Sequence, residues 1–216
     1  MIAGSAGVGL PFPRHLLGDD VVAAARALLG AILVRAPDRP GDQVRTGRIV
    51  EVEVYRGADD RASHARMGQT ARNAPMFGPP GHAYLYRVYG MHTCLNVVAG
   101  PDGAPAAILI RAVEPLEGIA AMRADCASGR APAVPPPNHR LASGPGLVCA
   151  AFGIDVSAGG LDLCQDASRV HLLTGVAPAS ITAGPRIGIA YAGEPAVSVP
   201  WRLGDAGSRS LSRRIP

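Results

Sequence analysis

Apolar and polar positions alternate most clearly over residues 47–55. Because successive side chains of a β-strand point to opposite faces, this period of two predicts a strand. One face of the strand carries three valines, Val50, Val52 and Val54. The opposite face is not simply polar, since it carries Ile49, Glu51, Glu53 and Tyr55. We therefore expect a strand with one face in the core and two carboxylates beside apolar groups on the other.

Capping and stop residues indicate three helices. Aspartate, proline and serine are residues that begin a first helical turn, and glycine commonly follows the last turn. The predicted helices are residues 21–29, capped by Asp19 or Asp20 and ended by Gly30, residues 115–127, opened by Pro115, and a short helix between Ser143-Gly-Pro145 and Gly153.

Short apolar runs predict further strands with short links between them. The segments 84–88 and 93–99 suit a hairpin with residues 89–92 at its tip. Residues 56–82, rich in glycine, arginine and proline, suit an ordered loop that contains a short helix. These links favour an α+β fold with a mainly antiparallel sheet over a doubly wound sheet. The remaining strands are expected at 31–35 and 106–113 and near 170–173, 186–191 and 198–203.

The composition fits one folded domain over residues 1–216. Apolar residues make up 48% and charged residues 18%, as is typical of a globular protein. We expect residues 1–11 to form a flexible arm and the proline-rich segment 128–140 to form a surface loop. The apolar run 21–34 contains Arg26 and is too short to cross a membrane. Because the N-terminus has no basic segment typical of a signal peptide, we expect a cytoplasmic protein.

The charged and sulfur-containing residues narrow the chemistry. The net charge of +4 is a mild bias toward a polyanionic partner, and all 21 basic residues are arginine. Since the chain has no lysine, no side-chain amine can form a Schiff base with a substrate, and covalent imine chemistry would have to use the N-terminal amine. The cysteines form no CxxC pair, so we expect reduced, buried thiols and neither a metal site nor disulfides. They are Cys94, Cys126, Cys149 and Cys164.

Glu51 and Glu53 are the first candidates for catalysis. Two positions apart on a strand, they share one face at a separation of about 7 Å. Taken alone, such a pair is more often a solvated strand face. Ile49 and Tyr55 on the same face favour a pocket, because enclosure by apolar and aromatic groups raises the pKa of a carboxylate toward the range of a general base.

Aromatic and amide side chains nearby are further candidates. Tyr84 and Tyr86 share a strand face, a pattern that ordinary sheet packing also produces. Tyr89 is different, because a large ring at a hairpin tip has no core to enter and suits insertion between the base pairs of a partner. An amide inside an apolar strand, as at Asn96, needs hydrogen-bond partners and can read the polar edge of a ligand.

Two more residues are ambiguous by themselves. His64 lies in a loop, where a lone histidine is commonly structural, and the histidines of this region have no metal-ligand spacing. Arg111 ends an apolar strand, where an arginine ordinarily extends to the surface. The significance of both residues depends on the residues around them.

Taken in order, these residues resemble the alkyladenine (3-methyladenine) DNA glycosylase family. Long motifs between residues 51 and 118 carry the resemblance, and weaker similarity extends from about residue 12 to residue 209. The motifs are Glu51-Val-Glu53-Val-Tyr55, Ala62-Ser-His64, Thr70-Ala-Arg72-Asn73, Met76-Phe77-Gly78, Tyr84-Leu-Tyr86-Arg-Val-Tyr89-Gly90-Met91, Cys94-Leu-Asn96 and Leu109-Ile-Arg111-Ala-Val-Glu114-Pro115-Leu-Glu-Gly118. The resemblance implies a compact α/β domain with a curved antiparallel sheet and a projecting hairpin.

The resemblance also implies the catalytic centre. The general base of the family falls on Glu53, and the arginine that orients the attacking water falls on Arg111. The aromatic walls of the base pocket fall on Tyr55, His64 and Tyr86. Tyr84 is then left as a packing residue.

The same resemblance implies the contacts to DNA. The amide that discriminates between bases falls on Asn96, and the wedge that enters the minor groove falls on Tyr89. Met91 lies beside this wedge, and Arg72 and Arg87 are candidates for phosphate contacts. The chain departs from the family at His92, where another aromatic residue is usual, and after Glu194, where Pro195 replaces tryptophan. A further departure follows Trp201-Arg202, where Leu203-Gly204 stands in place of an aromatic-rich pattern. The departures near the C-terminus leave the C-terminal wall of the pocket unassigned and do not affect the catalytic centre.

The activity implied is a monofunctional glycosylase that flips damaged purines out of double-stranded DNA and hydrolyses the N-glycosidic bond. It needs no cofactor, no membrane and no obligate protein partner. Two alternatives remain at this point. One is a non-catalytic nucleic-acid-binding module, against which Glu53 beside Arg111 argues. The other is a hydrolase of small N-glycosides, which would need neither Tyr89 at a hairpin tip nor a surplus of arginine.

Overall fold

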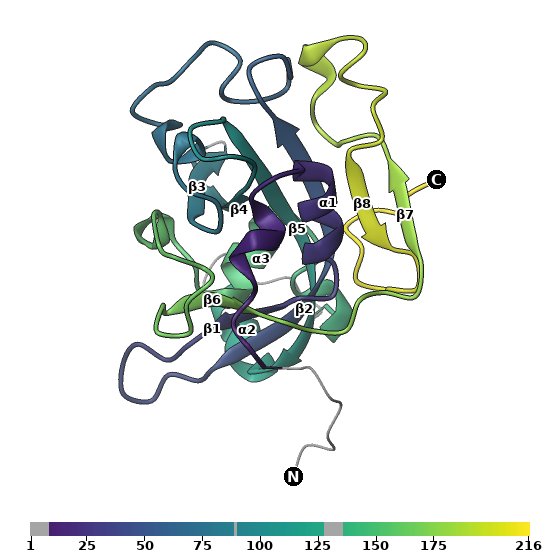
Figure 1. The fold of residues 1–216 in the computed structure, drawn as a ribbon. Helices are drawn as coiled ribbons and strands as arrows, with labels where there is room; N and C mark the ends of the chain where they lie inside the picture. The colour runs from purple at the N-terminus through teal and green to yellow at the C-terminus, as the bar shows by residue number, and fades with distance from the viewer. Residues whose placement is uncertain (1–8, 89, 128–135) are drawn as a thin grey trace.

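The structure, a computed structural model, describes residues 9–88, 90–127 and 136–216 (Figure 1). The named strands of these residues form one eight-stranded sheet in the order β3-β4-β5-β2-β1-β6, and β8 joins it by pairing with both β2 and β7. Every pairing is antiparallel. The strands are β1 (Ile32–Arg35), β2 (Arg45–Arg56), β3 (Ala83–Val88), β4 (His92–Val98), β5 (Ala106–Glu117), β6 (Val170–Leu173), β7 (Ile181–Gly184) and β8 (Arg202–Asp205).

Short helices pack around this curved sheet (Figure 1). The α-helices are α1 (Val21–Leu28), α2 (Ile119–Ala127) and α3 (Pro145–Phe152). The 3-10 helices are η1 (Arg14–Leu17), η2 (Ala74–Phe77), η3 (Asn138–Arg140), η4 (Val156–Ala158) and η5 (Ala190–Ala192). The predicted α+β class, antiparallel sheet and β3–β4 hairpin are confirmed. Within the described residues, no helix has the length and apolar character needed to cross a bilayer.

Helix α1 begins and ends where its sequence indicates. The Asp20 carboxylate accepts hydrogen bonds from the backbone N–H groups of Val22 and Ala23 at 2.7 and 3.3 Å. Such a cap satisfies donors that have no partner inside the helix. Gly30 then turns the chain with a φ of +93°, and a side chain there would meet the carbonyl of Val176 at 2.2 Å. The helix buries its apolar face in the main core beside β2 and β5.

The two longest strands, β2 and β5, pair at the centre of the sheet and both contain a bulge. The register slips at Val50 on β2 and at Arg111 on β5. A bulge leaves one residue out of the pairing and re-aims the side chains around it. The first slip puts Ile49 in the core cluster that also contains Val52 and Val54. The prediction that Ile49 shares the face of the two glutamates is therefore wrong.

Pro115 does not open a helix, as the sequence had indicated. It lies inside β5 opposite Gly47, beside a slip in the register, and α2 begins only at Ile119. Proline is tolerated in a strand where a bulge or an edge removes the need for its missing N–H. Gly118, with a φ of +73°, makes the turn between the strand and the helix.

The strand predicted at 186–191 is also wrong. The strand of this region is β7, which ends at Gly184, and residues 186–191 form a loop with the 3-10 helix η5. In this loop the Ile187 N–H donates to the side chain of Glu53 and not to a neighbouring strand. The strand expected near 198–203 begins later, at Arg202, as β8.

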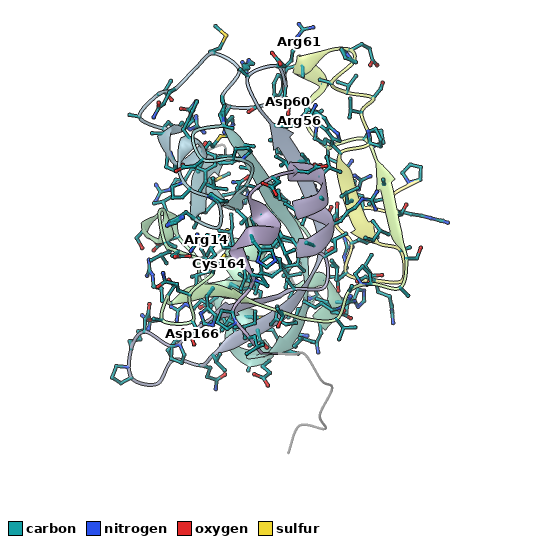
Figure 2. All side chains as sticks on the ribbon, viewed as in Figure 1. Arg14, Arg56, Asp60, Arg61, Cys164 and Asp166 are labelled. Atoms are coloured by element: carbon teal, nitrogen blue, oxygen red, sulfur yellow. The ribbon has the colours of Figure 1, made fainter. Side chains whose placement is uncertain are left out.

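The N-terminal segment is fixed from residue 10 onward. The carbonyl of Leu10 accepts a hydrogen bond from Thr174, Phe12 is buried, and Arg14 forms an ion pair with Asp162 at 2.5 Å. Arg14 lies beside Cys164 (Figure 2). Residues 1–8 of the predicted arm and residues 128–135 of the predicted surface loop lie outside the described residues.

Candidate active site

A cavity of 320 Å³ opens where the end of β2, the β3–β4 hairpin, β5 and the segment 187–191 meet. Ligand sites are commonly concave and mostly apolar, with a few polar groups that fix orientation. This cavity has that character, since tyrosine, methionine and aliphatic side chains surround an amide, an imidazole and a guanidinium. Residues predicted for the site line it from four different parts of the chain. They are Tyr55, His64, Tyr86, Asn96 and Arg111.

The Glu53 carboxylate lies directly behind this lining and is fully buried. Its Oε2 accepts a hydrogen bond from the Tyr55 hydroxyl at 2.9 Å and lies 3.3 Å from the guanidinium of Arg111. Its Oε1 accepts from the backbone N–H of Ile187 at 2.7 Å. Tyr55, Arg111 and Ile187 all line the cavity. Glu53 is therefore separated from the cavity only by the groups that hold its carboxylate.

Burial raises the pKa of Glu53 above its ordinary value. Arg111, the Ile187 N–H and the Tyr55 hydroxyl offset part of this rise, because each stabilises the charged carboxylate. Glu51 nearby raises the pKa of Glu53 further. A raised pKa suits a group that must accept a proton near neutral pH.

Glu51, two positions earlier on β2, is fully buried, does not line the cavity and is held by groups from other parts of the chain. Its oxygens accept hydrogen bonds from Arg111 at 3.1 Å and from Arg202 at 3.3 Å. Ser212 donates to it twice, through its backbone N–H at 2.5 Å and its hydroxyl at 2.8 Å. Glu51 thus ties β5, β8 and the C-terminal segment together. The structure distinguishes a structural glutamate from one next to the cavity.

Arg111 connects the two carboxylates because it is the bulged residue of β5. Its Nε contacts Glu51, one terminal nitrogen contacts Glu53, and the other donates to the Ser212 hydroxyl at 3.3 Å. A regular strand would keep this side chain in register with its neighbours, whereas the bulge re-aims it. The sequence-based alternative of a surface arginine is wrong, since Arg111 is buried.

His64, Tyr84 and Tyr86 form an aromatic wall of the cavity. The His64 and Tyr86 rings are 4.5 Å apart with an edge-to-face angle of 78°, and the Tyr84 and Tyr86 rings are 5.6 Å apart. Tyr84 packs in a small core cluster, as expected, but it also lines the cavity, and its hydroxyl lies 2.9 Å from His64 Nδ1. Burial, with Arg72 and Arg66 nearby, lowers the pKa of His64, which favours a neutral imidazole at neutral pH.

Asn96 is buried on β4 and faces the same cavity. Its amide nitrogen donates to the backbone carbonyl of Tyr84 across the hairpin at 3.0 Å. This bond fixes the amide plane, so the orientation of the polar edge presented to the cavity is set by β3.

Three of the predicted DNA contacts, Arg72, Arg87 and Met91, do not line the cavity. Arg72 and Arg87 are exposed, and the Arg72 guanidinium lies 5.8 Å from the centroid of the Tyr86 ring. Met91 is 78% exposed at the turn between β3 and β4. Tyr89 lies outside the described residues, so its role as a wedge stays a prediction.

Sequence reasoning missed the segment that closes the cavity. Ile187, Gly188, Ile189 and Tyr191 all line it, and the Tyr191 hydroxyl donates to the carbonyl of Ala62 at 3.1 Å. The weaker family similarity that extends to residue 209 was the available signal, but the apolar pattern of residues 186–191 predicts a strand there. Pro195 and Trp201, whose neighbourhood departs from the family pattern, line a separate pocket with Arg56.

No group of three or more histidine, cysteine, aspartate or glutamate side chains in the described part of the chain could hold a metal ion. The four cysteines are free thiols, of which Cys94 and Cys149 are buried, whereas Cys126 and Cys164 are only half-buried. Burial raises the pKa of Cys94, which lines the cavity, to about 11. Its thiol therefore stays protonated at neutral pH.

Comparison with known proteins identifies the class. The family described as "Methylpurine-DNA glycosylase (MPG)" matches residues 15–209. A protein of Methanocella arvoryzae is 45% identical over 204 residues, which cover 94% of this chain and 96% of that protein. Proteins of Anaeromyxobacter dehalogenans and Bacillus cereus are 42% and 41% identical, and the matches cover 96% and 94% of this chain and 89% and 98% of those proteins. All three carry the name "Putative 3-methyladenine DNA glycosylase".

The site and these relatives define an enzyme that hydrolyses N-glycosyl bonds, with DNA as its substrate. The chain belongs to the methylpurine-DNA glycosylase family. The resemblance found in the sequence is thereby confirmed. Neither a non-catalytic binding module nor a hydrolase of small N-glycosides agrees with this family.

Proposed function

We propose that this protein releases alkylated and deaminated purines of the 3-methyladenine, 7-methylguanine and hypoxanthine class from duplex DNA. The observation that carries the proposal is the fully buried Glu53 carboxylate, held by Tyr55, Arg111 and Ile187 at the lining of an aromatic cavity. A buried carboxylate with no structural partner beyond that lining is a candidate for catalysis, because its burial is otherwise costly.

The target nucleotide must leave the stack to reach this cavity. Flipping costs a few kcal/mol, and least for a damaged or mispaired base, which gives some selectivity by itself. The flipped purine would stack against Tyr55, His64 and Tyr86, at roughly 1–3 kcal/mol per stacked base. A positively charged alkylpurine would gain a further cation–π attraction of roughly 0.5–2 kcal/mol. The amide of Asn96 would crowd the 2-amino group of guanine and so act by exclusion.

The chemical step would be direct attack by water. Glu53 accepts a proton from a water that sits at the lining, where Tyr55 and Arg111 meet its carboxylate. The water oxygen forms a bond to the sugar C1′, and the bond from C1′ to the purine nitrogen breaks, with its electron pair leaving on the purine. The carboxylate also stabilises the positive charge of the oxocarbenium-like transition state. A positively charged alkylpurine leaves as a neutral base, and the proton on Glu53 then passes to solvent. Hypoxanthine leaves as an anion and takes up one proton, which balances the proton that the water lost. The products are a free purine and an intact strand with an abasic site.

Contacts outside the cavity would hold the duplex. Tyr89 would fill the gap that the flipped nucleotide leaves, with Met91 beside it. Arg72 and Arg87 would contact phosphates, which position the duplex without reading its sequence. No obligate protein partner is needed for such a single-site reaction.

The reaction should stop at the abasic site. An enzyme that also cleaves the strand uses an amine nucleophile, and this chain has no lysine. Borohydride treatment during turnover should therefore trap no covalent adduct between protein and DNA, and a trapped adduct would refute monofunctional hydrolysis.

The experiment that tests the proposal is a panel of duplex oligonucleotides, each with one lesion, treated with protein and then with alkali to cleave abasic sites. Glu53→Gln keeps the size of the side chain but removes the general base. Its single-turnover rate should fall by 10²–10⁴, the contribution typical of acid–base catalysis. Glu117→Gln, at the exposed end of β5, is the matched control and should retain the wild-type rate. Release by Glu53→Gln at the wild-type rate would exclude Glu53 as the base.

A further inference from the structure

We propose that the buried ion pair of Asp60 and Arg186 positions the Tyr55 hydroxyl and the Ile187 N–H, the two hydrogen-bond donors that hold the Glu53 carboxylate. This inference rests on the proposed role of Glu53. Arg186 and Asp60 touch no substrate in this scheme, so both are positioning residues.

The ion pair is completely enclosed. The side chains of Arg186 and Asp60 are 0% and 1% exposed, and two guanidinium nitrogens meet two carboxylate oxygens at 2.6 and 2.8 Å. Figure 2 labels Asp60 next to Arg56, the last residue of β2. A buried ion pair is often no more stabilising than well-packed apolar residues of similar volume. Stability by itself therefore does not account for its presence at this place.

Arg186 fixes Tyr55 from behind. The guanidinium carbon lies 4.8 Å from the centroid of the Tyr55 ring and 5.0 Å from that of Trp201, so it packs between the two aromatic residues. Tyr55 lines the cavity and Arg186 does not. An arginine stacked on a ring in this way restricts the ring, and the position of the ring determines where the hydroxyl meets Glu53.

Arg186 also fixes the segment that carries the second donor. A guanidinium nitrogen donates to the carbonyl of Val54 at 2.8 Å, on β2 between Glu53 and Tyr55. Since Ile187 is the next residue after Arg186, this bond ties the segment to the strand that bears Glu53. The Ile187 N–H then lies 2.7 Å from Glu53 Oε1. One ion pair thus holds both donors against one carboxylate.

Glu53 has other charged and titratable neighbours, and none of them depends on Asp60. They are Glu51 on its own strand, Arg111 on β5, Arg202 opposite it on β8, Tyr86 on β3 and Cys94 on β4. A change confined to the ion pair should therefore act on Glu53 through Tyr55, Ile187 or the charge of Arg186.

Two substitutions separate position from charge. Arg186→Gln removes a positive charge from the neighbourhood of Glu53, whereas Asp60→Asn leaves that positive charge without its partner. The two variants therefore change the local charge in opposite directions. Arg186→Gln removes the guanidinium that contacts Tyr55 and Val54, and Asp60→Asn removes the carboxylate that holds this guanidinium in place. Both variants should therefore loosen the donors to Glu53. Loss of those donors favours the protonated carboxylic acid.

The test measures single-turnover release of hypoxanthine from a duplex as a function of pH. On the acid side of the pH–rate profile, the rate falls because Glu53 becomes protonated and inactive. In both variants this acid limb should move to higher pH by about one unit, and the maximal rate should fall about tenfold or more. Shifts in opposite directions would mean that charge acts and not position. If the acid limbs of both variants stay in place and only the maximal rates fall, the ion pair has a merely structural role. Either result overturns the proposal.

Controls keep these outcomes distinct. Asp42→Asn breaks another buried ion pair, with Arg35 and Arg45 at the β1–β2 turn, and should leave the acid limb in place. If Arg186→Gln does not fold, Asp60→Asn decides alone, because its amide oxygen can still accept the Ala62 N–H that Asp60 now accepts at 3.0 Å. Glu53→Gln in the same assay reports on the proposed function: an inactive Glu53→Gln with unmoved limbs refutes only the positioning role.

Discussion

The hydroxyl of Tyr55 donates a hydrogen bond to Oε2 of Glu53 at 2.9 Å. Burial raises the pKa of Tyr55 well above its ordinary value, and the charge of Glu53 adds to the rise. The phenol therefore keeps its proton and remains a donor. The same side chain lines the cavity with its ring and stabilises the ionised form of Glu53 with its hydroxyl.

Replacement of Tyr55 by phenylalanine should move the pH dependence of base release. Burial raises the pKa of Glu53, and the Tyr55 hydroxyl is one of the groups that lower it again, so its loss raises that pKa. Because Glu53 must be ionised to accept a proton, the acid limb of the single-turnover rate should move to higher pH by up to about one unit. Tyr191→Phe removes a hydroxyl from the same cavity without touching Glu53, and its limb should stay in place. A downward shift in Tyr55→Phe would contradict this assignment.

Replacement of Glu51 by alanine should destabilise the fold. The change leaves Arg202 without its buried carboxylate, leaves Arg111 with Glu53 as its remaining carboxylate, and removes both hydrogen bonds from Ser212. Breaking a buried ion pair by removing one partner costs about 3–5 kcal/mol of unfolding free energy. Urea unfolding followed by circular dichroism measures this loss. The exposed Glu117→Ala serves as the reference and should stay within about 0.5 kcal/mol of wild type. An equally small effect in Glu51→Ala would show that its network contributes little.

His64 should titrate below the ordinary histidine range. Its pKa is lowered chiefly by burial and then by the charges of Arg72 and Arg66, so Arg72→Ala should raise the pKa of His64 without restoring its ordinary value. NMR titration of the imidazole measures this change, with His64→Gln to assign the signal. Arg87→Ala on β3 is the control and should leave the pKa of His64 unchanged, since Arg87 does not contribute to its shift. Since the unfolded chain binds this proton more readily, the stability that His64 contributes should fall as the pH drops through the unfolded pKa. A His64 pKa above 6.5 would contradict this account.

Replacement of Asn96 by alanine should relax discrimination against a 2-amino group. Hypoxanthine lacks this group and 7-methylguanine carries it, so the ratio of kcat/KM for 7-methylguanine to that for hypoxanthine should rise about tenfold. Both rates should also fall somewhat, because the Tyr84 carbonyl loses the donor that Asn96 supplies at 3.0 Å. Thr93→Ala, further along β4, should leave the ratio unchanged. An unaltered ratio in Asn96→Ala would remove Asn96 from base discrimination.

Local signals predicted most of the elements correctly. Asp20 precedes α1 and Gly30 follows it, and Gly153 ends α3. Strands β3 and β4 form the hairpin that the alternation predicts. In each case the deciding interaction joins residues close in sequence, such as a cap or a turn. The predictions were wrong where pairing with a residue far away in the sequence overrode the local pattern. Pro115 reads as a helix start by itself, but β2 opposite it extends the strand.

The alternation pattern could not predict that Glu51 is held in a structural network whereas Glu53 lies next to the cavity. Both residues have the same spacing, the same face and the same complete burial. Their difference comes from Arg202, Ser212 and Ile187, which lie far along the chain and reach the two carboxylates only in the folded protein. The resemblance to the family pointed to Glu53 as the base, which stays a prediction, and the packing shows only how the surroundings of the two carboxylates differ.

The sequence by itself determined the α+β class, the hairpin, the family and the cluster of aromatic and acidic residues from which the cavity is built. Short-range chemistry suffices for these, because alternation, caps and motif order are properties of neighbouring residues. Only the tertiary structure decided that the bulge at Arg111 aims a guanidinium between two glutamates, that residues 187–191 close the cavity, and that Arg186 packs behind Tyr55. Bulge placement and long-range ion pairs follow from the register and packing of whole strands, which no local window of sequence contains.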